Sequence, residues 1–120
     1  LHIPSEMIHY GVTKSAQISL ARGLAETTEG TNVTVNSILP GPTSSEGVMT
    51  FVERLADEKG IGMDKMKEEF FQTARPTSLL KRFTEPEEIA NMVAYVCSPL
   101  SSATNGAPLR ADGGVVRAMA

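Results

Sequence analysis

Several residue types are scarce in this 120-residue chain, and each scarcity excludes a class of protein. Its single cysteine, Cys97, cannot form an internal disulfide, which is typical of a reducing compartment and predicts a cytoplasmic protein. His2, His9 and Cys97 are not spaced as metal ligands, so we expect no metal site. Tryptophan is absent and aromatic residues make up only 5%, so the core must be mainly aliphatic and methionine-rich.

Long hydrophobic runs and basic clusters are also missing. No apolar stretch approaches the roughly 18 residues of a transmembrane helix, and no signal peptide is visible. The net charge is −3 without a Lys/Arg run, which argues against nucleic acid or an anionic membrane as the partner. The chain begins with Leu1 rather than Met and enters a helical pattern almost at once, so we expect it to be the inside of a longer protein.

The first half of the chain contains a helical pattern followed by a strand pattern. Residues 5–29 predict a helix that Ser5 caps and Gly30 ends. Its buried stripe is expected to consist of small and aliphatic residues: Ala16, Leu20, Ala21, Leu24 and Ala25. Residues 33–39 are β-branched and uncharged, as in a buried parallel strand, and the Pro40-Gly41-Pro42 sequence breaks that strand.

An insertion over residues 43–78 has a different character. It contains two helical patterns, at 46–59 and 63–73, separated by Gly60 and Gly62. The first pattern has Val48, Phe51, Val52 and Leu55 on one side, and the second contains Met66, Phe70 and Phe71. Such an insertion after a strand is a candidate lid. Its Phe and Met residues fit a local core or an apolar substrate pocket equally well.

The last part predicts one more helix and strand. Thr84 and Glu87 have the spacing of a capping box, with Pro86 in the first turn. Ile89, Val93 and Val96 would form the buried face, with Cys97 as a small core residue. Residues 107–111 predict a final strand, followed by an Asp112-Gly-Gly turn. The order helix, strand, lid, helix, strand predicts an α/β fold with two parallel strands, the last part of a doubly wound sheet.

Tyr10 and Lys14 are the residue pair with the clearest chemical meaning. At positions i and i+4 they lie one turn apart on the same helix face. A nearby ammonium favours the phenolate, so Lys14 would lower the pKa of Tyr10 from about 10 toward a working value for an acid/base group. Spacing alone makes the pair weak evidence, because many helices contain such a pair by chance.

Taken together, these motifs resemble the C-terminal half of a classical short-chain dehydrogenase/reductase. They are Tyr10-x-x-x-Lys14, the strand ending in Pro-Gly-Pro42, the lid, Arg82-Phe-Thr-Glu-Pro-Glu-Glu-Ile89 and Asn105-Gly-Ala-Pro-Leu-Arg-Ala-Asp-Gly-Gly114, in the family's order. The resemblance covers essentially the whole chain. It implies one Rossmann-like domain portion over residues 1–120 and a homo-oligomer, a dimer or a tetramer.

The resemblance also implies roles for individual residues. Tyr10 would be the catalytic acid/base, and Lys14 would hydrogen-bond the ribose of NAD or NADP. Pro40, Gly41 and Pro42 would lie against the nicotinamide, with Thr43 and Ser45 as candidates for holding its carboxamide. Ser45 stands where the family usually has threonine. The substrate would be a small carbonyl compound or alcohol.

Other family features do not occur in the sequence. There is no Gly-x-x-x-Gly-x-Gly phosphate turn, and the family's catalytic serine and asparagine have no counterpart, since Ser5 lies too near Tyr10 and Asn36 belongs to the strand motif. We therefore expect this chain to be inactive alone. The alternative is a truncated, non-catalytic interaction module derived from the same family, which would self-associate or pair with another chain. Isomerisation or dehydration by a complete protein also stays open.

Overall fold

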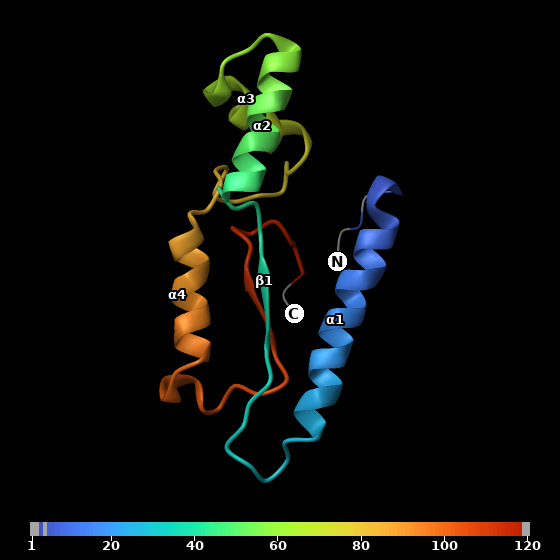
Figure 1. Ribbon diagram of the computed structural model, residues 1–120, viewed down its shortest axis with the longest axis vertical. Coiled ribbons are helices and arrows are strands. Elements are labelled where there is room, and N and C mark those ends of the chain that lie inside the picture. Colours follow the sequence, from blue (N-terminus) through green and yellow to red (C-terminus); the bar gives the residue numbers. More distant parts are fainter. Residues whose placement is uncertain (1–2, 4, 119–120) are drawn as a thin grey trace. The chain divides into compact units, whose positions relative to one another are not determined.

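The computed structural model describes Ile3 and residues 5–118, which form an α/β fold with a two-stranded sheet (Figure 1). The elements are, in chain order, α1 (Ile8–Glu26), β1 (Ser37–Pro40), α2 (Glu46–Lys59), α3 (Met63–Thr73), α4 (Pro86–Val96) and β2 (Pro108–Ala111). Short 3-10 turns lie at Ser5–Met7 and Pro99–Ser101. Two compact units share these elements: residues up to Leu39 with Asn91–Arg110, and Pro40–Ala90 with the segment from Ala111.

The two strands run parallel, as predicted. Ser37 N donates to Ala107 O at 2.9 Å, and four residues on along both strands Gly41 N donates to Ala111 O at 3.1 Å. This equal advance along both strands is the register of a parallel pair. The α/β class and the parallel pairing of the sequence-based prediction are thereby confirmed.

β1 is shorter than the predicted strand over residues 33–39. In the segment before β1, asparagine side chains add to the backbone pairing. Gly106 N donates to Val35 O at 2.9 Å, and Val35 N donates to Asn105 Oδ1 at 2.9 Å. Asn36 donates its side-chain amide to Thr104 O at 2.9 Å and accepts from Ala107 N at 3.0 Å. Side chains thus satisfy the polar backbone groups before the strand begins. The first three residues of β1 are partly buried and Pro40 is exposed, so the predicted burial of this strand is wrong for this chain.

Helix α1 begins and ends inside the predicted range. Its N-cap position is Met7, without a side-chain capping bond, so the predicted cap at Ser5 is wrong. At the other end the Thr27 and Thr28 hydroxyls donate to Leu24 O and Ala25 O at 2.7 and 2.9 Å. These bonds satisfy carbonyls that the helix end leaves open, so α1 stops before Gly30, which adopts a φ of 74° in the following turn.

The predicted buried stripe of α1 lies largely on the surface of the described chain. Only Gly11 and Ala25 are buried on this helix. Leu20 is 64% exposed and Leu24 is 47% exposed. Small residues made the stripe suited to close packing, but within the described residues this face has little to pack against.

Helices α2 and α3 have the predicted bounds and form their own core. Gly60 ends α2 in the left-handed region, with φ 64° and ψ 34°, where glycine is tolerated without strain. The buried core consists of Val52, Ala56, Met66, Phe71 and Phe83. An ion pair between Lys59 and Glu69 also links the two helices.

Phe70, Phe71 and Phe83 form an aromatic cluster, with ring centroids 5.0–5.1 Å apart. Such offset and edge-to-face contacts add to the apolar burial of the rings. Of the two interpretations of the lid's Phe and Met residues, the structure supports a local core. Phe51 is the exception, because it is 46% exposed.

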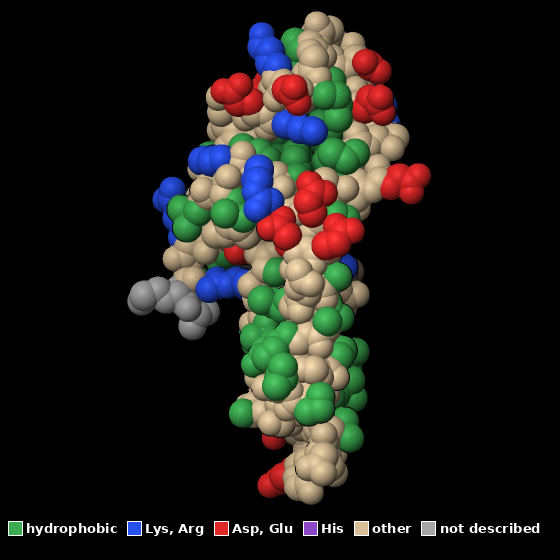
Figure 2. Space-filling view, turned by 90° about the vertical axis from the view of Figure 1, so that its left-hand side faces the viewer, with side chains coloured by type: hydrophobic (Ala, Val, Ile, Leu, Met, Phe, Trp, Pro, Cys, Tyr) green, Lys and Arg blue, Asp and Glu red, His purple; other side chains and the backbone are tan. Residues whose placement is uncertain are grey.

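Helix α4 begins at Pro86, which the prediction placed within the first turn, and its apolar face is not buried. Figure 2 shows hydrophobic side chains gathered on the surface around this helix. Val93 is 42% exposed, while Ile89 and Val96 are partly buried. Cys97 is exposed, so its prediction as a small core residue is wrong.

Candidate active site

Helix α1 brings Tyr10 and Lys14 together on one face. The Lys14 Nζ atom lies 5.4 Å from the centroid of the Tyr10 ring. Tyr10 is 49% exposed, and Lys14 is exposed as well. Lys14 Nζ also donates to Gln17 Oε1 at 3.3 Å, one turn further on. An ammonium therefore stands beside an accessible phenol, an arrangement suited to stabilising a phenolate by its charge.

The Pro40-Gly41-Pro42 turn lies where β1 ends. Gly41 is packed so closely on the end of β2 that a Cβ atom there would lie 2.5–2.8 Å from backbone atoms of Asp112. Only glycine fits this close approach of two backbones. Asp112 in turn accepts from Gly114 N and Val116 N at 2.9 and 3.0 Å, which folds the predicted Asp-Gly-Gly turn.

Thr43 and Ser45, the two predicted carboxamide ligands, differ in their hydrogen bonding. The Thr43 hydroxyl donates to Gly41 O at 3.0 Å and lies 3.1 Å from the Thr84 hydroxyl. Ser45 occupies the N-cap position of α2, is exposed, and its side chain makes no capping bond. The hydroxyl of Ser45 therefore remains available to a ligand, while that of Thr43 is used within the turn.

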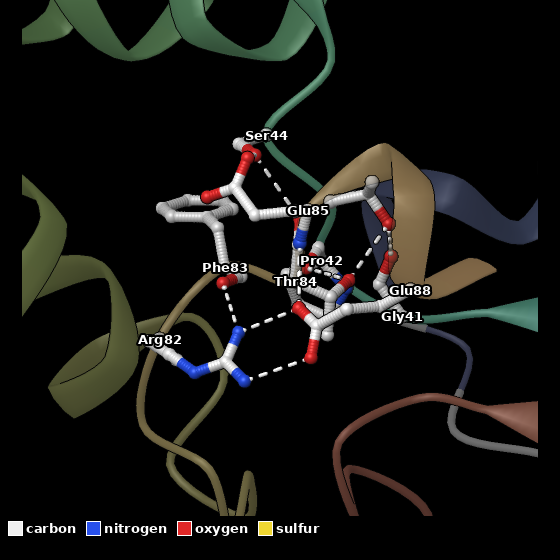
Figure 3. Close-up of polar contacts among 9 residues, drawn as sticks. Gly41, Pro42, Ser44, Arg82, Phe83, Thr84, Glu85 and Glu88 are labelled. Atoms are coloured by element: carbon white, nitrogen blue, oxygen red, sulfur yellow. Dashed lines mark hydrogen bonds and ion pairs between the residues drawn. The ribbon is translucent and has the colours of Figure 1, made fainter. Parts of the chain in front are cut away.

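Arg82 and Glu88 form a charged contact beside this turn. Figure 3 shows the Arg82 guanidinium facing the Glu88 carboxylate, with distances of 2.7 and 2.9 Å. The hydrogen bond from Arg82, together with that from the Glu85 backbone N–H, lowers the pKa of Glu88 to about 2. The same contact with Glu88 raises the pKa of Arg82.

The start of α4 differs from the predicted capping box. Glu88, not Glu87, accepts from the backbone, with Glu85 N at 2.8 Å. The Thr84 hydroxyl does not cap the helix; it donates to Pro42 O at 3.1 Å. The sequence signal for the true arrangement is a glutamate three residues after Glu85. It was missed because Thr84 and Glu87 have the same spacing.

The predicted site residues thus fall into two groups. Tyr10 and Lys14 belong to the unit that contains α1, and Pro40–Ser45 belong to the unit that contains α2 and α3. Sequence reasoning missed Ser44 and Thr84, which are bonded to each other beside the Pro-Gly-Pro turn. Among the described residues, no three His, Cys, Asp or Glu side chains are grouped so that they could hold a metal ion. Across Ile3 and residues 5–118, no helix has the length and apolar character needed to cross a bilayer.

Comparison with known proteins identifies the family. The family model described as enoyl-(acyl carrier protein) reductase matches residues 2–116. The uncharacterized oxidoreductase YvaG of Bacillus subtilis is 49% identical over 114 residues, covering 95% of this chain and 43% of that protein. The 3-oxoacyl-[acyl-carrier-protein] reductase FabG of Aquifex aeolicus is 32% identical over 108 residues, covering 90% and 38%.

A solved structure supports the same relationship. The L-sorbose reductase of Gluconobacter frateurii, complexed with NADPH and L-sorbose, superposes with a TM-score of 0.85 at 26% identity. The match covers 94% of this chain and 42% of that enzyme. The chain thus spans less than half the length of the relatives that it matches. Sequence and fold agree with the motif series, and the chain belongs to the short-chain dehydrogenase/reductase family of oxidoreductases.

Proposed function

We propose that this chain is the C-terminal catalytic part of an NAD(P)-dependent oxidoreductase that transfers hydride between the nicotinamide and a carbonyl or alcohol substrate. The observation that carries the proposal is the pair on α1: an accessible Tyr10 phenol with the Lys14 ammonium 5.4 Å from its ring. A relative of similar fold is complexed with NADPH and a sugar substrate, which supports a nicotinamide cofactor here. The homo-oligomeric state and the cytoplasmic location remain predictions.

The two residues of the pair have different roles in the proton transfer. When bound, NAD(P)H supplies the hydride, with its two electrons, to the carbonyl carbon. The Tyr10 phenol gives its proton to the carbonyl oxygen, so that the product is a neutral alcohol, and takes a proton from the alcohol in the reverse direction. The Lys14 ammonium stabilises the phenolate that remains on Tyr10.

The residues present fit the nicotinamide half of the cofactor. Lys14 carries ammonium donors for ribose hydroxyls, and the exposed Ser45 hydroxyl follows the Pro-Gly-Pro turn, where it would meet the carboxamide. The sequence contains no glycine-rich phosphate turn. The pyrophosphate and adenosine would therefore be bound by residues outside this chain, and we propose that the 120 residues alone are inactive.

The test uses a chimaera in which this chain replaces the aligned 114 residues of the Bacillus subtilis relative. The chimaera is assayed with NADH and NADPH against a panel of aldehydes, ketones and alcohols. The 120-residue chain is assayed in parallel. Turnover by the chimaera and none by the chain alone is the expected result; turnover by the chain alone would overturn the claim that it is inactive.

Substitutions in the chimaera assign the chemistry to Tyr10. Tyr10→Phe is expected to lower kcat by about 10²–10⁴-fold, the usual contribution of a positioned acid/base group. Tyr95→Phe is the matched control, because Tyr95 has the same exposed fraction of 49% on α4. Equal activity of Tyr10→Phe and Tyr95→Phe would contradict the proposed role.

Lys14 is tested in the same assay. Lys14→Met should lower kcat and also raise KM for the cofactor, since the ammonium is proposed to serve both the phenolate and the ribose. Lys65→Met, at an exposed position of α3, is the control and should leave both constants unchanged. A chimaera that folds but turns over no substrate and binds no nicotinamide cofactor would favour the non-catalytic interaction module.

A further inference from the structure

The segment between α3 and α4 is fastened to the turn that follows β1. Thr84 N donates to Pro42 O at 2.9 Å, and Ser44 N donates to Thr84 O at 2.8 Å. These bonds form a parallel bridge between Thr43 and Thr84, outside the two named strands. The backbone on both sides of Thr43 is therefore held by one residue, Thr84.

The side chain of Thr84 adds a second set of contacts. Its hydroxyl donates to Pro42 O at 3.1 Å and lies 3.1 Å from the Thr43 hydroxyl, which in turn donates to Gly41 O at 3.0 Å. Each hydroxyl carries one proton, so two protons are shared over three contacts. Figure 3 shows Thr84 against Pro42 at the centre of this network.

The position of Thr84 is itself fixed from the other side. Thr84 is 5% exposed, so water offers its hydroxyl little alternative. The Ser44 hydroxyl lies 3.1 Å from Thr84 O and 2.7 Å from Glu85 Oε2. Glu88 accepts from Glu85 N at 2.8 Å. The turn is thus connected through Thr84 to the first turn of α4.

We propose that Thr84 is a positioning residue for cofactor binding: its backbone and hydroxyl hold the Pro40–Thr43 turn in the conformation that receives the nicotinamide ring. This inference rests on the proposed function, in which that turn lies against the nicotinamide. Thr84 itself touches neither cofactor nor substrate in this role. It acts through Pro42 O, Gly41 O and the Thr43 hydroxyl.

The proposal predicts an effect on one end of the cofactor only. A turn that loses the Thr84 hydroxyl would visit other conformations, and the nicotinamide would bind only the competent fraction of them. Adenosine and pyrophosphate would not be affected, because their proposed site lies outside this chain. A ligand without nicotinamide therefore separates positioning from general loss of structure.

The experiment compares Thr84→Val and Thr84→Ser in the chimaera. Dissociation constants are measured by titration for the preferred cofactor, NADH or NADPH, and for the ADP-ribose or 2′-phospho-ADP-ribose that lacks its nicotinamide. Thr84→Val should weaken cofactor binding about fivefold to tenfold, as expected for one lost hydrogen bond, and leave ADP-ribose binding unchanged. Thr84→Ser, which keeps the hydroxyl, should stay within about twofold of the parent.

Two further variants keep the proposal falsifiable. Ser101→Ala removes a hydroxyl of similar burial that donates to Val96 O at 2.7 Å, and it should weaken neither ligand. Ser44→Ala removes the hydroxyl that contacts Thr84 O and Glu85 Oε2, and so loosens the hold on Thr84 from the other side. It should weaken cofactor binding about twofold to threefold, and it decides the matter if Thr84→Val does not fold. Equal effects on both ligands, or none on either, would overturn the inference.

Failure of the inference and failure of the proposed function give different results. If Tyr10→Phe abolishes turnover while Thr84→Val and Ser44→Ala leave cofactor affinity unchanged, only the positioning role is wrong. If the parent chimaera binds ADP-ribose but gains nothing from the nicotinamide, the proposed function fails and the positioning role fails with it.

Discussion

The lid helices α2 and α3 and the helix α1 differ in where their apolar side chains lie. α2 and α3 share a core in which Val52 is 1% exposed and Phe71 is 3% exposed. α1 is longer, yet Leu20 and Val12 on its surface are 64% and 61% exposed. The lid therefore obtains its packing from residues close in sequence, whereas α1 keeps most of its apolar surface open.

This difference separates what stabilises the chain from what would perform its chemistry. The lid core gains the free energy of burying large apolar side chains, about 25 cal/mol per Å². Tyr10 and Lys14 lie on a helix of which only Gly11 and Ala25 are buried within the described residues. Stability and the proposed catalysis can therefore be perturbed separately, and the following predictions use that separation.

The largest expected effect is the loss of a lid core residue. Phe71→Ala should lower the free energy of unfolding by about 3–5 kcal/mol, because it removes a buried ring in contact with Phe70 and Phe83. Leu20→Ala on α1 should cost less than about 1 kcal/mol, because that side chain is mainly solvated. Urea denaturation followed by circular dichroism measures both. Similar losses of unfolding free energy in the two variants would contradict the difference in packing between the lid and α1.

A second test concerns the close approach of the two strand ends. Gly41→Ala should destabilise the chain by about 1–3 kcal/mol, because its Cβ would overlap the Asp112 backbone. Gly47→Ala is the matched control: a Cβ there meets nothing within 4 Å, and α2 should gain up to about 1 kcal/mol from the better helix former. The same denaturation assay applies, and opposite signs for the two substitutions are the expected outcome.

The exposed apolar side chains of α1 predict that the chain self-associates. Val12→Glu with Leu20→Glu should weaken self-association at least about tenfold, since both side chains are apolar and exposed. Sedimentation velocity over a range of concentrations measures it. The same double substitution should leave the lid core intact. A parent chain that is monomeric at all concentrations would contradict this expectation.

The smallest expected effect is the pH dependence of the Arg82–Glu88 contact. The folded-state pKa of Glu88 is about 2, below its ordinary value of 4.5, so the contact contributes stability above pH 4.5 and loses it as the pH falls toward 2. Glu88→Gln should remove that part of the acid sensitivity. The urea midpoint of unfolding should then change less between pH 4.5 and pH 2 than in the parent chain. Glu87→Gln, in the same helical turn, should leave the pH dependence of the urea midpoint unchanged.

The sequence predicted the lid best because its signals are local. Gly60 and Gly62 separate the two helical patterns, and the spacing of apolar residues within each pattern predicts the bounds 46–59 and 63–73. The structure has the same bounds. The burial of α1 and α4 could not be predicted, since it depends on partners distant in sequence. The start of α4 was mistaken for a related reason: whether Thr84 or Glu85 caps the helix depends on Pro42, more than 40 residues away.

Part of the candidate site could also be predicted from local sequence signals. The Tyr10–Lys14 pair needs only helical spacing, so its geometry on α1 could be anticipated. The internal use of the Thr43 hydroxyl needs Thr84 at 3.1 Å and could not be read from neighbouring residues. That the Thr43 hydroxyl is bonded within the turn, while the Ser45 side chain makes no capping bond, therefore became visible only in the structure.

The bridge between Thr43 and Thr84 also bears on how this fold can change. The segment that contains α2 and α3 begins after Thr43 and ends before Thr84, and these two residues are bonded to each other. Lengthening a loop whose ends are already joined costs little additional chain entropy. The length of the segment between Thr43 and Thr84 can therefore change at little cost in chain entropy, while the junction keeps the Pro-Gly-Pro turn and the start of α4 as they are.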